Sequence, residues 1–255
     1  MDTVVMTGAA GLVGTAVREG LREVAARLVL VDRRPLTQET PGEEVRQAVL
    51  DSVETVTGLV EGADAIVHLA GVPDEAPLPD LLEGNVLGTH HVLEAARRAG
   101  VPRVVLASSN RLTGCYPSSV TVSPEMPPRP DGLYGVSKVA VEALGRLYAD
   151  KFGLEVVCLR IGSLEPEPAD ARQLSTWLSP RDCAGFFVDA LTRKDVGFLT
   201  LYAVSANTRR FWELSDGYRP QDDAEAHADR LAHERGPDLQ GGAYAGPAYT
   251  LRHLA

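Results

Sequence analysis

The sequence predicts an α/β fold: a doubly wound parallel sheet of the Rossmann type, with helices on both faces and a small C-terminal addition. Short apolar runs bounded by turn residues alternate with longer helical patterns, as expected for parallel strands that are buried on both faces. A glycine-rich turn from Gly8 to Gly14 follows the first apolar run. Because 255 residues can bury one good core, we expect a single domain over residues 1–255.

Each expected strand is a short apolar run next to turn residues. The strands are Thr3–Thr7, Leu28–Val31, Val45–Leu50, Ala65–Leu69, Arg103–Ala107, Glu155–Ile161 and Phe198–Ala203. The expected helices are Leu12–Ala26, Val53–Glu61, Leu78–Ala99, Leu133–Phe152 and Pro180–Thr192. Gly100 and Gly153 stand where helices should stop, and a strand follows each of them.

Two segments lack a regular pattern. Residues Ser118 to Pro130 carry four prolines, so we expect a loop that can wall a pocket. From about residue 215 the chain becomes polar and rich in glycine, which predicts a C-terminal extension with one helix around Ala224–Arg235.

Composition excludes several classes of function. The net charge of −10 and pI near 5.1 oppose binding to nucleic acid or to anionic membranes. The N-terminal segment runs straight into an apolar strand without a basic leader or a long apolar stretch, so we expect a cytoplasmic protein. Cys115, Cys158 and Cys183 have no His or Cys at metal-ligand spacing, which predicts reduced structural thiols and no metal.

The glycine-rich turn predicts a dinucleotide site. Gly8, Gly11 and Gly14 occupy a strand-to-helix junction, where a tight turn and close approach of a pyrophosphate need residues without side chains. The backbone N–H groups of Leu12, Val13 and Gly14 would then bind the phosphates.

Asp32 is expected to decide which dinucleotide binds. It ends the second strand, where a carboxylate accepts hydrogen bonds from the adenosine ribose and repels a 2′-phosphate, so NAD is favoured over NADP. Arg33 and Arg34 leave NADP as the alternative, because a guanidinium there can hold that phosphate. Asp51 can accept from the adenine amino group, whereas His68 is interpreted as a packed core histidine. The other expected cofactor contacts are Ser52, Leu69, Ala70, Gly71, Asn85, Tyr134, Lys138 and Ile161.

Tyr134 and Lys138 stand four residues apart on an expected helix. Tyr134 follows Ser109 by twenty-five residues, and the proline-rich loop lies between them. Residues at this spacing share a helix face, so the ammonium can favour the phenolate of Tyr134 and make it a base. Ser109 would orient the reacting hydroxyl. The alternative is a surface tyrosine beside a solvated lysine.

These residues resemble the short-chain dehydrogenase/reductase superfamily in its extended, epimerase-like branch, over residues 3 to about 205. The resemblance rests on the following positions: Gly8, Gly11, Gly14, Asp32, His68 to Gly71, Asn85, Ser109, Tyr134 and Lys138. A closer resemblance, to uronate dehydrogenase, rests on further segments: Ala107 to Asn110, Arg129 to Gly135, Arg160 to Ser163, Glu165 to Arg172, Thr176 to Ser179 and Ser205 to Thr208.

The closer resemblance implies oxidation of the anomeric carbon of a uronic acid to a lactone, with NAD as hydride acceptor. It implies that Tyr134 is the base, that Lys138 tunes Tyr134 and holds the nicotinamide ribose, and that the segments at about residues 163–180 bind substrate. The implied substrate contacts are Ser109, Asn110, Arg111, Tyr134, Ser163 and Arg172. Arg172 would clamp the carboxylate, since its planar fork suits that group.

Two residues depart from the uronate dehydrogenase pattern and bear on the sugar. Pro73 replaces a serine, which removes a hydroxyl and a backbone donor, and Arg111 replaces a histidine after Asn110. Arg111 would either bind an additional anion or point to solvent.

Three alternative functions remain open from the sequence. One is a related enzyme that acts on a different sugar in a biosynthetic pathway. The second is a nucleotide-sugar epimerase or dehydratase, although only about ninety residues follow Ser163 and no second basic cluster is obvious. The third is a catalytically silent dinucleotide sensor, which has no need of Tyr134, Lys138 and Ser109 together. A homo-oligomer is expected in each case.

Overall fold

A single parallel sheet organises the computed structural model, which describes residues 1–214, 216–231 and 236–254. The sheet has seven strands in the order β3-β2-β1-β4-β5-β6-β9. These are β1 (Thr3–Thr7), β2 (Arg27–Asp32), β3 (Glu43–Gln47), β4 (Ala65–His68), β5 (Arg103–Ser109), β6 (Glu155–Ile161) and β9 (Phe198–Ala203). The strand order reverses between β1 and β4, so the predicted doubly wound, Rossmann-type fold is confirmed.

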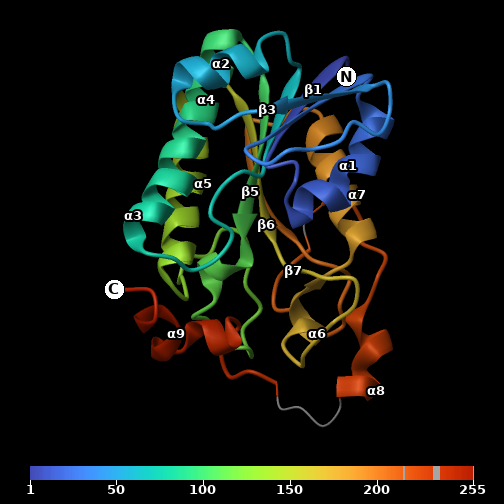
Figure 1. Ribbon diagram of the computed structural model, residues 1–255. Helices are drawn as coiled ribbons and strands as arrows, with labels where there is room; N and C mark the ends of the chain where they lie inside the picture. Colours follow the sequence, from blue (N-terminus) through green and yellow to red (C-terminus); the bar gives the residue numbers. More distant parts are fainter. Residues whose placement is uncertain (215, 232–235, 255) are drawn as a thin grey trace.

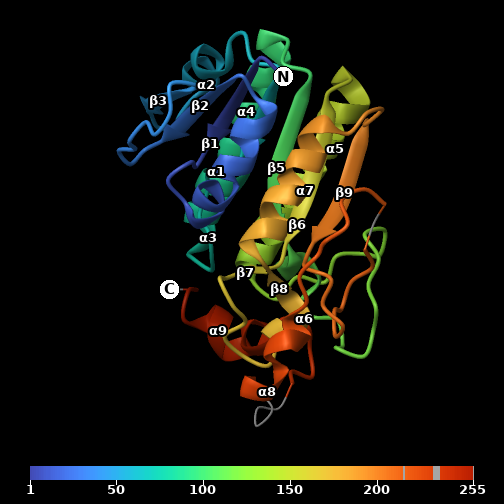
Figure 2. The same ribbon diagram turned by 90° about the vertical axis from the view of Figure 1, so that its right-hand side faces the viewer.

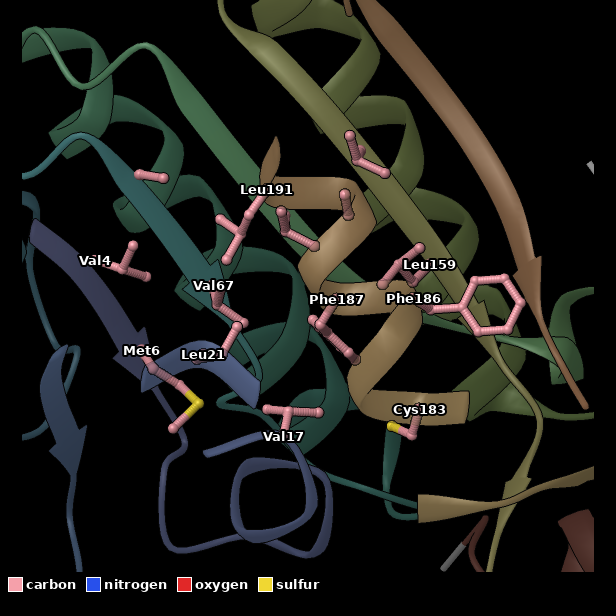
Figure 3. Close-up of a cluster of buried hydrophobic side chains, with 14 of the residues drawn as sticks. Val4, Met6, Val17, Leu21, Val67, Leu159, Cys183, Phe186, Phe187 and Leu191 are labelled. Atoms are coloured by element: carbon pink, nitrogen blue, oxygen red, sulfur yellow. The ribbon is translucent and has the colours of Figure 1, made fainter. Parts of the chain in front are cut away.

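Helices cover both faces of the sheet (Figures 1 and 2). Helices α1 (Leu12–Val24) and α7 (Pro180–Thr192) pack together on one face, and α2 (Val53–Val60), α4 (Gly88–Ala99) and α5 (Leu133–Phe152) lie on the other. Figure 3 shows the core of the first face, where Val17 and Leu21 meet Phe187 and Leu191 over the sheet. A second apolar cluster fills the opposite face. The continuous apolar runs of the strands follow from this double burial.

The third strand differs from its prediction. β3 spans Glu43–Gln47 rather than Val45–Leu50, because Glu43 pairs in register with Leu28 of β2. Glu43 is buried, and its carboxylate accepts hydrogen bonds from Arg18 at 2.7 Å and Arg22 at 2.7 Å. The two guanidiniums depress the pKa of Glu43 to about 2 despite its burial. An apolar pattern could not reveal a strand that begins with an ion pair.

The predicted helix Leu78–Ala99 is not one regular α-helix. A short helix, α3 (Leu78–Leu81), runs into a π-helical segment, η1 (Leu82–Leu87), before α4 begins at Gly88. The wider turn places Asn85 in the interior, where its amide bonds both backbone groups of Val72. Such π-helical turns commonly stand at functional sites.

The segments at about residues 163–180 form a small subdomain beyond the edge of the main sheet. They contain a two-stranded parallel sheet of β7 (Ser163–Leu164) and β8 (Trp177–Leu178), joined by α6 (Gln173–Thr176). A 3₁₀ turn, η2 (Asn110–Thr113), follows β5. The loop from Ser118 to Pro130 contains no helix and makes one bridge, from Val122 to Trp212, as the prolines predict.

The described part of the C-terminal segment forms four short helices. It contains η3 (Ala224–His227), α8 (Ala228–Leu231), η4 (Gly242–Ala245) and α9 (Pro247–Leu251). The predicted helix Ala224–Arg235 is therefore a 3₁₀ turn followed by α8, and its last four residues lie outside the described ones. Figure 1 shows η4 and α9, drawn in red, beneath the lower ends of α5 and of the sheet.

Candidate active site

The predicted cofactor and catalytic residues gather at the carboxyl edge of the parallel sheet. Thr7, Asp32, His68 and Ser109 end β1, β2, β4 and β5, which are neighbours in the sheet. Ligands of open α/β sheets bind at this edge, at the point where the strand order reverses. The fold therefore brings together residues that are up to about a hundred positions apart in the chain.

The glycine-rich turn forms a cradle that side chains would fill. Gly8 has φ +70°, and a Cβ there would lie 2.5 Å from the backbone nitrogen of Ala70. Gly11 precedes α1 and offers no side chain to cap it. The first-turn N–H groups of Leu12, Val13 and Gly14 can therefore bind a phosphate, and this observation fits a dinucleotide.

The Asp32 carboxylate lies directly beside the glycine-rich turn. It is buried and accepts from the backbone N–H groups of Ala10 and Arg34, each at 2.9 Å. The Arg34 side chain lies 3.6 Å from the same carboxylate and donates to the carbonyl of Ala10 at 2.5 Å. Arg33 is exposed. Arg34 is thus engaged with the carboxylate, so a 2′-phosphate would meet negative charge here as well as a cation.

The remaining predicted cofactor residues have three kinds of environment: the loop after β4, the exposed surface, and positions held by local hydrogen bonds or by a strand end. Leu69, Ala70 and Gly71 form the loop after β4, next to the Gly8 turn. Asp51 is exposed. Others are held by local bonds: Ser52 caps α2 by accepting from the backbone N–H of Thr55 at 3.1 Å, Asn85 bonds Val72 and Ser137, and Ile161 ends β6 partly buried.

His68 has the environment that was predicted for a core histidine. It is 4% exposed, with Nδ1 2.8 Å from the Thr7 hydroxyl and Nε2 3.3 Å from the Thr89 hydroxyl. Burial lowers the pKa of His68 to about 3. The ring is therefore neutral at physiological pH, and the interpretation as a core residue is confirmed.

Tyr134 and Lys138 lie on the first turns of α5, facing the end of β5. All three predicted catalytic side chains are buried, and Ser109 lies close enough to the Tyr134 phenol to lower its pKa. The Lys138 ammonium lies 5.7 Å from the centre of the Tyr134 ring and donates to the carbonyl of Ala107 at 2.9 Å. The three predicted residues are thus brought together.

Burial sets the proton affinities of this group. It raises the pKa of Tyr134 to about 12, while the Ser109 side chain and the charge of Arg111 act to lower it. Burial also lowers the pKa of Lys138 to about 8. Ser109 and Arg111 therefore favour the phenolate in this structure, and the predicted role of the Lys138 ammonium in tuning Tyr134 stays a prediction.

Arg172 lies beside Ser163 at the start of α6. Its Nε donates to the carbonyl of Gln240 at 2.7 Å and its Nη1 donates to the hydroxyl of Ser163 at 3.3 Å. Burial lowers the pKa of Arg172. Among the described residues no carboxylate forms a salt bridge with it, although it borders an open cavity of about 730 Å³ that the C-terminal segment also lines. Such a guanidinium is suited to an anionic ligand.

Arg111 has the opposite environment. Its guanidinium lies 2.6 Å from Asp131, 2.8 Å from Asp74 and 3.4 Å from Glu75. Although burial acts to lower the pKa of Arg111, the carboxylates raise it. The alternative in which Arg111 points to solvent is wrong, since the residue is buried. The alternative in which it binds an additional anion stays a prediction, although carboxylates of the protein already pair with it.

Aromatic rings of the C-terminal segment complete this side of the site. The Arg111 guanidinium lies 4.2 Å from the centre of the Tyr244 ring and 5.3 Å from that of Tyr249. The Arg172 guanidinium lies 5.3 Å from the same Tyr244 ring. The hydroxyl of Tyr249 donates to Asp74 at 2.9 Å. These cation–π contacts tie the end of the chain to both arginines.

Sequence reasoning missed this surrounding group, namely Asp74, Glu75, Asp131, Gln240, Tyr244 and Tyr249. Each contacts a site residue through a long-range interaction, so spacing along the chain carries no signal for it. The burial of Glu75 and Asp131 reveals their roles only in the structure, because ionised side chains are rarely buried without a partner.

Two further properties of the described residues bear on the function. In the part of the chain that the structure describes, no helix is long and apolar enough to span a bilayer. No group of three or more His, Cys, Asp or Glu side chains among those residues is arranged to hold a metal ion.

The sequence as a whole matches a protein family. The profile described as "NAD dependent epimerase/dehydratase family" matches residues 4–184. The chain belongs to this family. The predicted superfamily branch and the predicted cofactor, NAD, are thereby confirmed.

Several similar proteins within the family are dehydrogenases that act on sugars or sugar acids. Uronate dehydrogenase of Agrobacterium fabrum is 42% identical over 231 residues, covering 89% of this chain and 87% of that protein. NAD-dependent glucose-6-phosphate dehydrogenase of Haloferax volcanii is 35% identical over 248 residues, which cover 87% of this chain and 94% of that protein. The solved structure of uronate dehydrogenase from Agrobacterium tumefaciens with NAD has a TM-score of 0.90 at 39% identity. The match covers 96% of this chain and 97% of that one. The protein described by the present structure is an NAD-dependent dehydrogenase of this family.

Proposed function

We propose that this enzyme oxidises the anomeric carbon of a hexuronate to the lactone. The C1–H bond breaks as hydride leaves, the C1–O bond becomes a carbonyl, and the hydroxyl proton passes to Tyr134. NAD, when bound, accepts the hydride at its nicotinamide ring. The glycine cradle of the β1–α1 turn and the Asp32 carboxylate would hold the adenine half of the cofactor.

The proton is assigned to the Tyr134 oxygen. Ser109 lies close enough to that phenol to lower its pKa, so a sugar hydroxyl placed between the two oxygens would be oriented for transfer. The raised pKa of the buried phenol means that it is protonated before the cofactor binds, and that positive charge must favour the phenolate during turnover. Arg111 and Lys138 supply such charge from this chain.

The observation that carries the substrate assignment is the environment of Arg172. It is a partly buried cation next to an open cavity, and no described carboxylate pairs with it. A substrate carboxylate would complete a bidentate pair there. Ser163, which bonds Arg172, and Asn110, which is buried beside Ser109, would contact the sugar hydroxyls.

The charge balance favours a carboxylate over a phosphate or a neutral sugar. Among the described residues, Arg111 is ion-paired with Asp74 and Asp131, whereas Arg172 forms no ion pair and can take a ligand. One guanidinium suits a monoanion, whereas a sugar phosphate carries about two negative charges. A neutral aldose would leave the partly buried guanidinium without a partner.

The test is NADH formation with a panel of sugars. We expect NADH with glucuronate or galacturonate, and at least about a thirtyfold lower kcat/KM with the neutral aldoses and glucose 6-phosphate, since a buried charge-assisted contact is worth roughly 2–5 kcal/mol. Release of NADH also separates this function from epimerisation of a nucleotide sugar, which returns the hydride. A higher kcat/KM with glucose 6-phosphate would replace the proposal with the function of the Haloferax relative.

The cytoplasmic location and the homo-oligomer remain predictions. Sedimentation of the purified protein tests the second directly, and the masses to compare are 27.3 kDa and its multiples.

A further inference from the structure

The catalytic helix begins without a cap of its own. Helix α5 starts at Leu133, and the residue before it, Gly132, has no side chain to bond the free N–H groups of the first turn. Tyr134 is the second residue of this helix. Because helix ends fray unless their N–H groups are bonded, the position of the Tyr134 phenol depends on what holds this turn.

A carboxylate from a distant loop takes that role. Glu75 accepts from the backbone N–H of Leu133 at 2.8 Å through Oε1, and from the backbone N–H of Tyr134 at 3.1 Å through Oε2. These are charge-assisted hydrogen bonds at the positive end of the helix dipole, where a carboxylate is most stabilising. Glu75 therefore bonds the backbone of the base itself.

The surroundings are built around this carboxylate. The Glu75 side chain is fully buried, and a Cβ on Gly132 would lie 2.4 Å from its Oε2. Glycine at position 132 thus leaves the space that the carboxylate fills. Arg111 donates to the same oxygen at 3.4 Å, and Asp131 holds Arg111 from the other side.

The loop that carries Glu75 is itself fixed. Asn85 bonds both backbone groups of Val72, and its amide also donates to the hydroxyl of Ser137 on α5 at 2.9 Å. The carboxylate of Asp74 accepts from the backbone N–H of Glu75 at 2.7 Å. The loop after β4 is thus linked to α5 at two points, directly at the first turn through Glu75 and indirectly at Ser137 through Asn85.

We propose that Glu75 is a positioning residue, which holds the Tyr134 phenol against Ser109 by capping the catalytic helix. The inference rests on the proposed role of Tyr134 as base. Glu75 touches neither the sugar nor the cofactor in this account, so its loss should lower kcat and leave NAD affinity unchanged. A displacement of about 1 Å at a reacting group can cost on the order of a hundredfold in rate.

The experiment compares Glu75→Gln and Glu75→Ala with a matched control, Asp182→Asn. Asp182 is also a fully buried carboxylate that accepts from two backbone N–H groups, those of Gln221 at 2.8 Å and Asp222 at 3.0 Å, but it contacts the C-terminal segment. For each variant we would measure kcat, KM for the sugar, the Kd of NAD and Tm. Glutamine keeps one acceptor oxygen and alanine keeps none, so the loss should be larger for Glu75→Ala.

The expected result is a fall in kcat of about tenfold or more for Glu75→Gln, with the Kd of NAD within about twofold, and a much smaller fall for Asp182→Asn at a similar loss of Tm. In a Tyr134→Phe background, Glu75→Gln should cause no further loss. If kcat falls equally in Glu75→Gln and Asp182→Asn, or if NAD binding is lost with kcat retained, the positioning role is overturned. If Tyr134→Phe alone keeps its activity, the proposed function has failed instead.

Discussion

The guanidinium of Arg111 lies 4.2 Å from the centre of the Tyr244 ring, although 133 positions separate them in the chain. The same ring faces Arg172 at 5.3 Å. One aromatic side chain of the C-terminal segment therefore contacts both the balanced arginine and the arginine that is proposed to hold the substrate.

Removing this ring should weaken sugar binding. We expect Tyr244→Ala to raise KM for a uronate severalfold, because a partly desolvated cation–π contact is worth about 1–2 kcal/mol and also orients Arg172. The Kd of NAD should not change. Tyr244→Phe keeps the ring and serves as the control, with KM near that of the wild type. Equal KM values in wild type and Tyr244→Ala would show that the C-terminal segment does not shape the sugar site.

Tyr134→Phe should abolish turnover and leave NAD binding nearly intact, since only the ionisable oxygen is removed. A general base contributes on the order of a hundredfold or more. Initial rates of NADH formation and calorimetric titration with NAD provide the two measurements. A variant that retains more than about a tenth of the wild-type kcat would exclude Tyr134 as the base.

Asp32→Ala should shift cofactor preference toward NADP. The change removes an acceptor for the ribose hydroxyls and the repulsion of a 2′-phosphate, and it frees Arg34 from its contact at 3.6 Å. The ratio of kcat/KM for NAD to that for NADP is the quantity to compare. A wild type that uses NADP as well as NAD would mean that Arg33 or Arg34 dominates at this position.

His68 should make the protein less stable in acid. Burial lowers its pKa from 6.5 to about 3, so between these values the unfolded chain binds a proton that the folded chain does not. The contribution of His68 to the free energy of unfolding is therefore fully present above pH 6.5. It is lost as pH falls from 6.5 toward 3, by up to about 1.4 kcal/mol per pH unit. Urea unfolding at several pH values should give a steeper loss for wild type than for His68→Asn, which does not titrate. Parallel slopes would contradict the buried, neutral imidazole.

The sequence predicted most of the sheet and the edge of the sheet at which the proposed site residues gather. Strands buried on both faces leave continuous apolar runs, and residues at their carboxyl ends, such as Asp32 and Ser109, must then meet at one edge. Local spacing also placed Tyr134 and Lys138 on one helix face. Strand positions and residue spacing on a helix depend on local sequence patterns, so they can be predicted from the sequence.

What sequence reasoning missed depends on contacts between distant segments. The start of β3 is stabilised by Arg18 and Arg22 pairing with Glu43, and the π-helical turn by Asn85 bonding Val72. The role of Arg111 could not be inferred from its replacement of a histidine, because three carboxylates on two distant segments, Asp74 and Glu75 on one and Asp131 on the other, balance its charge. Long-range ion pairs leave no periodic pattern.

The most direct test of the proposed function is the uronate-to-aldose ratio of kcat/KM in wild type, Arg172→Lys and Arg172→Ala. If the guanidinium holds the substrate carboxylate, Arg172→Ala should cost roughly 2–5 kcal/mol of transition-state binding with a uronate, and Arg172→Lys should lose the bidentate geometry. Neutral aldoses do not use that contact, so their turnover should be about equal in all three proteins. The uronate-to-aldose ratio of kcat/KM should therefore fall in both variants. An unchanged ratio would contradict the proposed role of Arg172, because the carboxylate would then be bound elsewhere or not recognised at all.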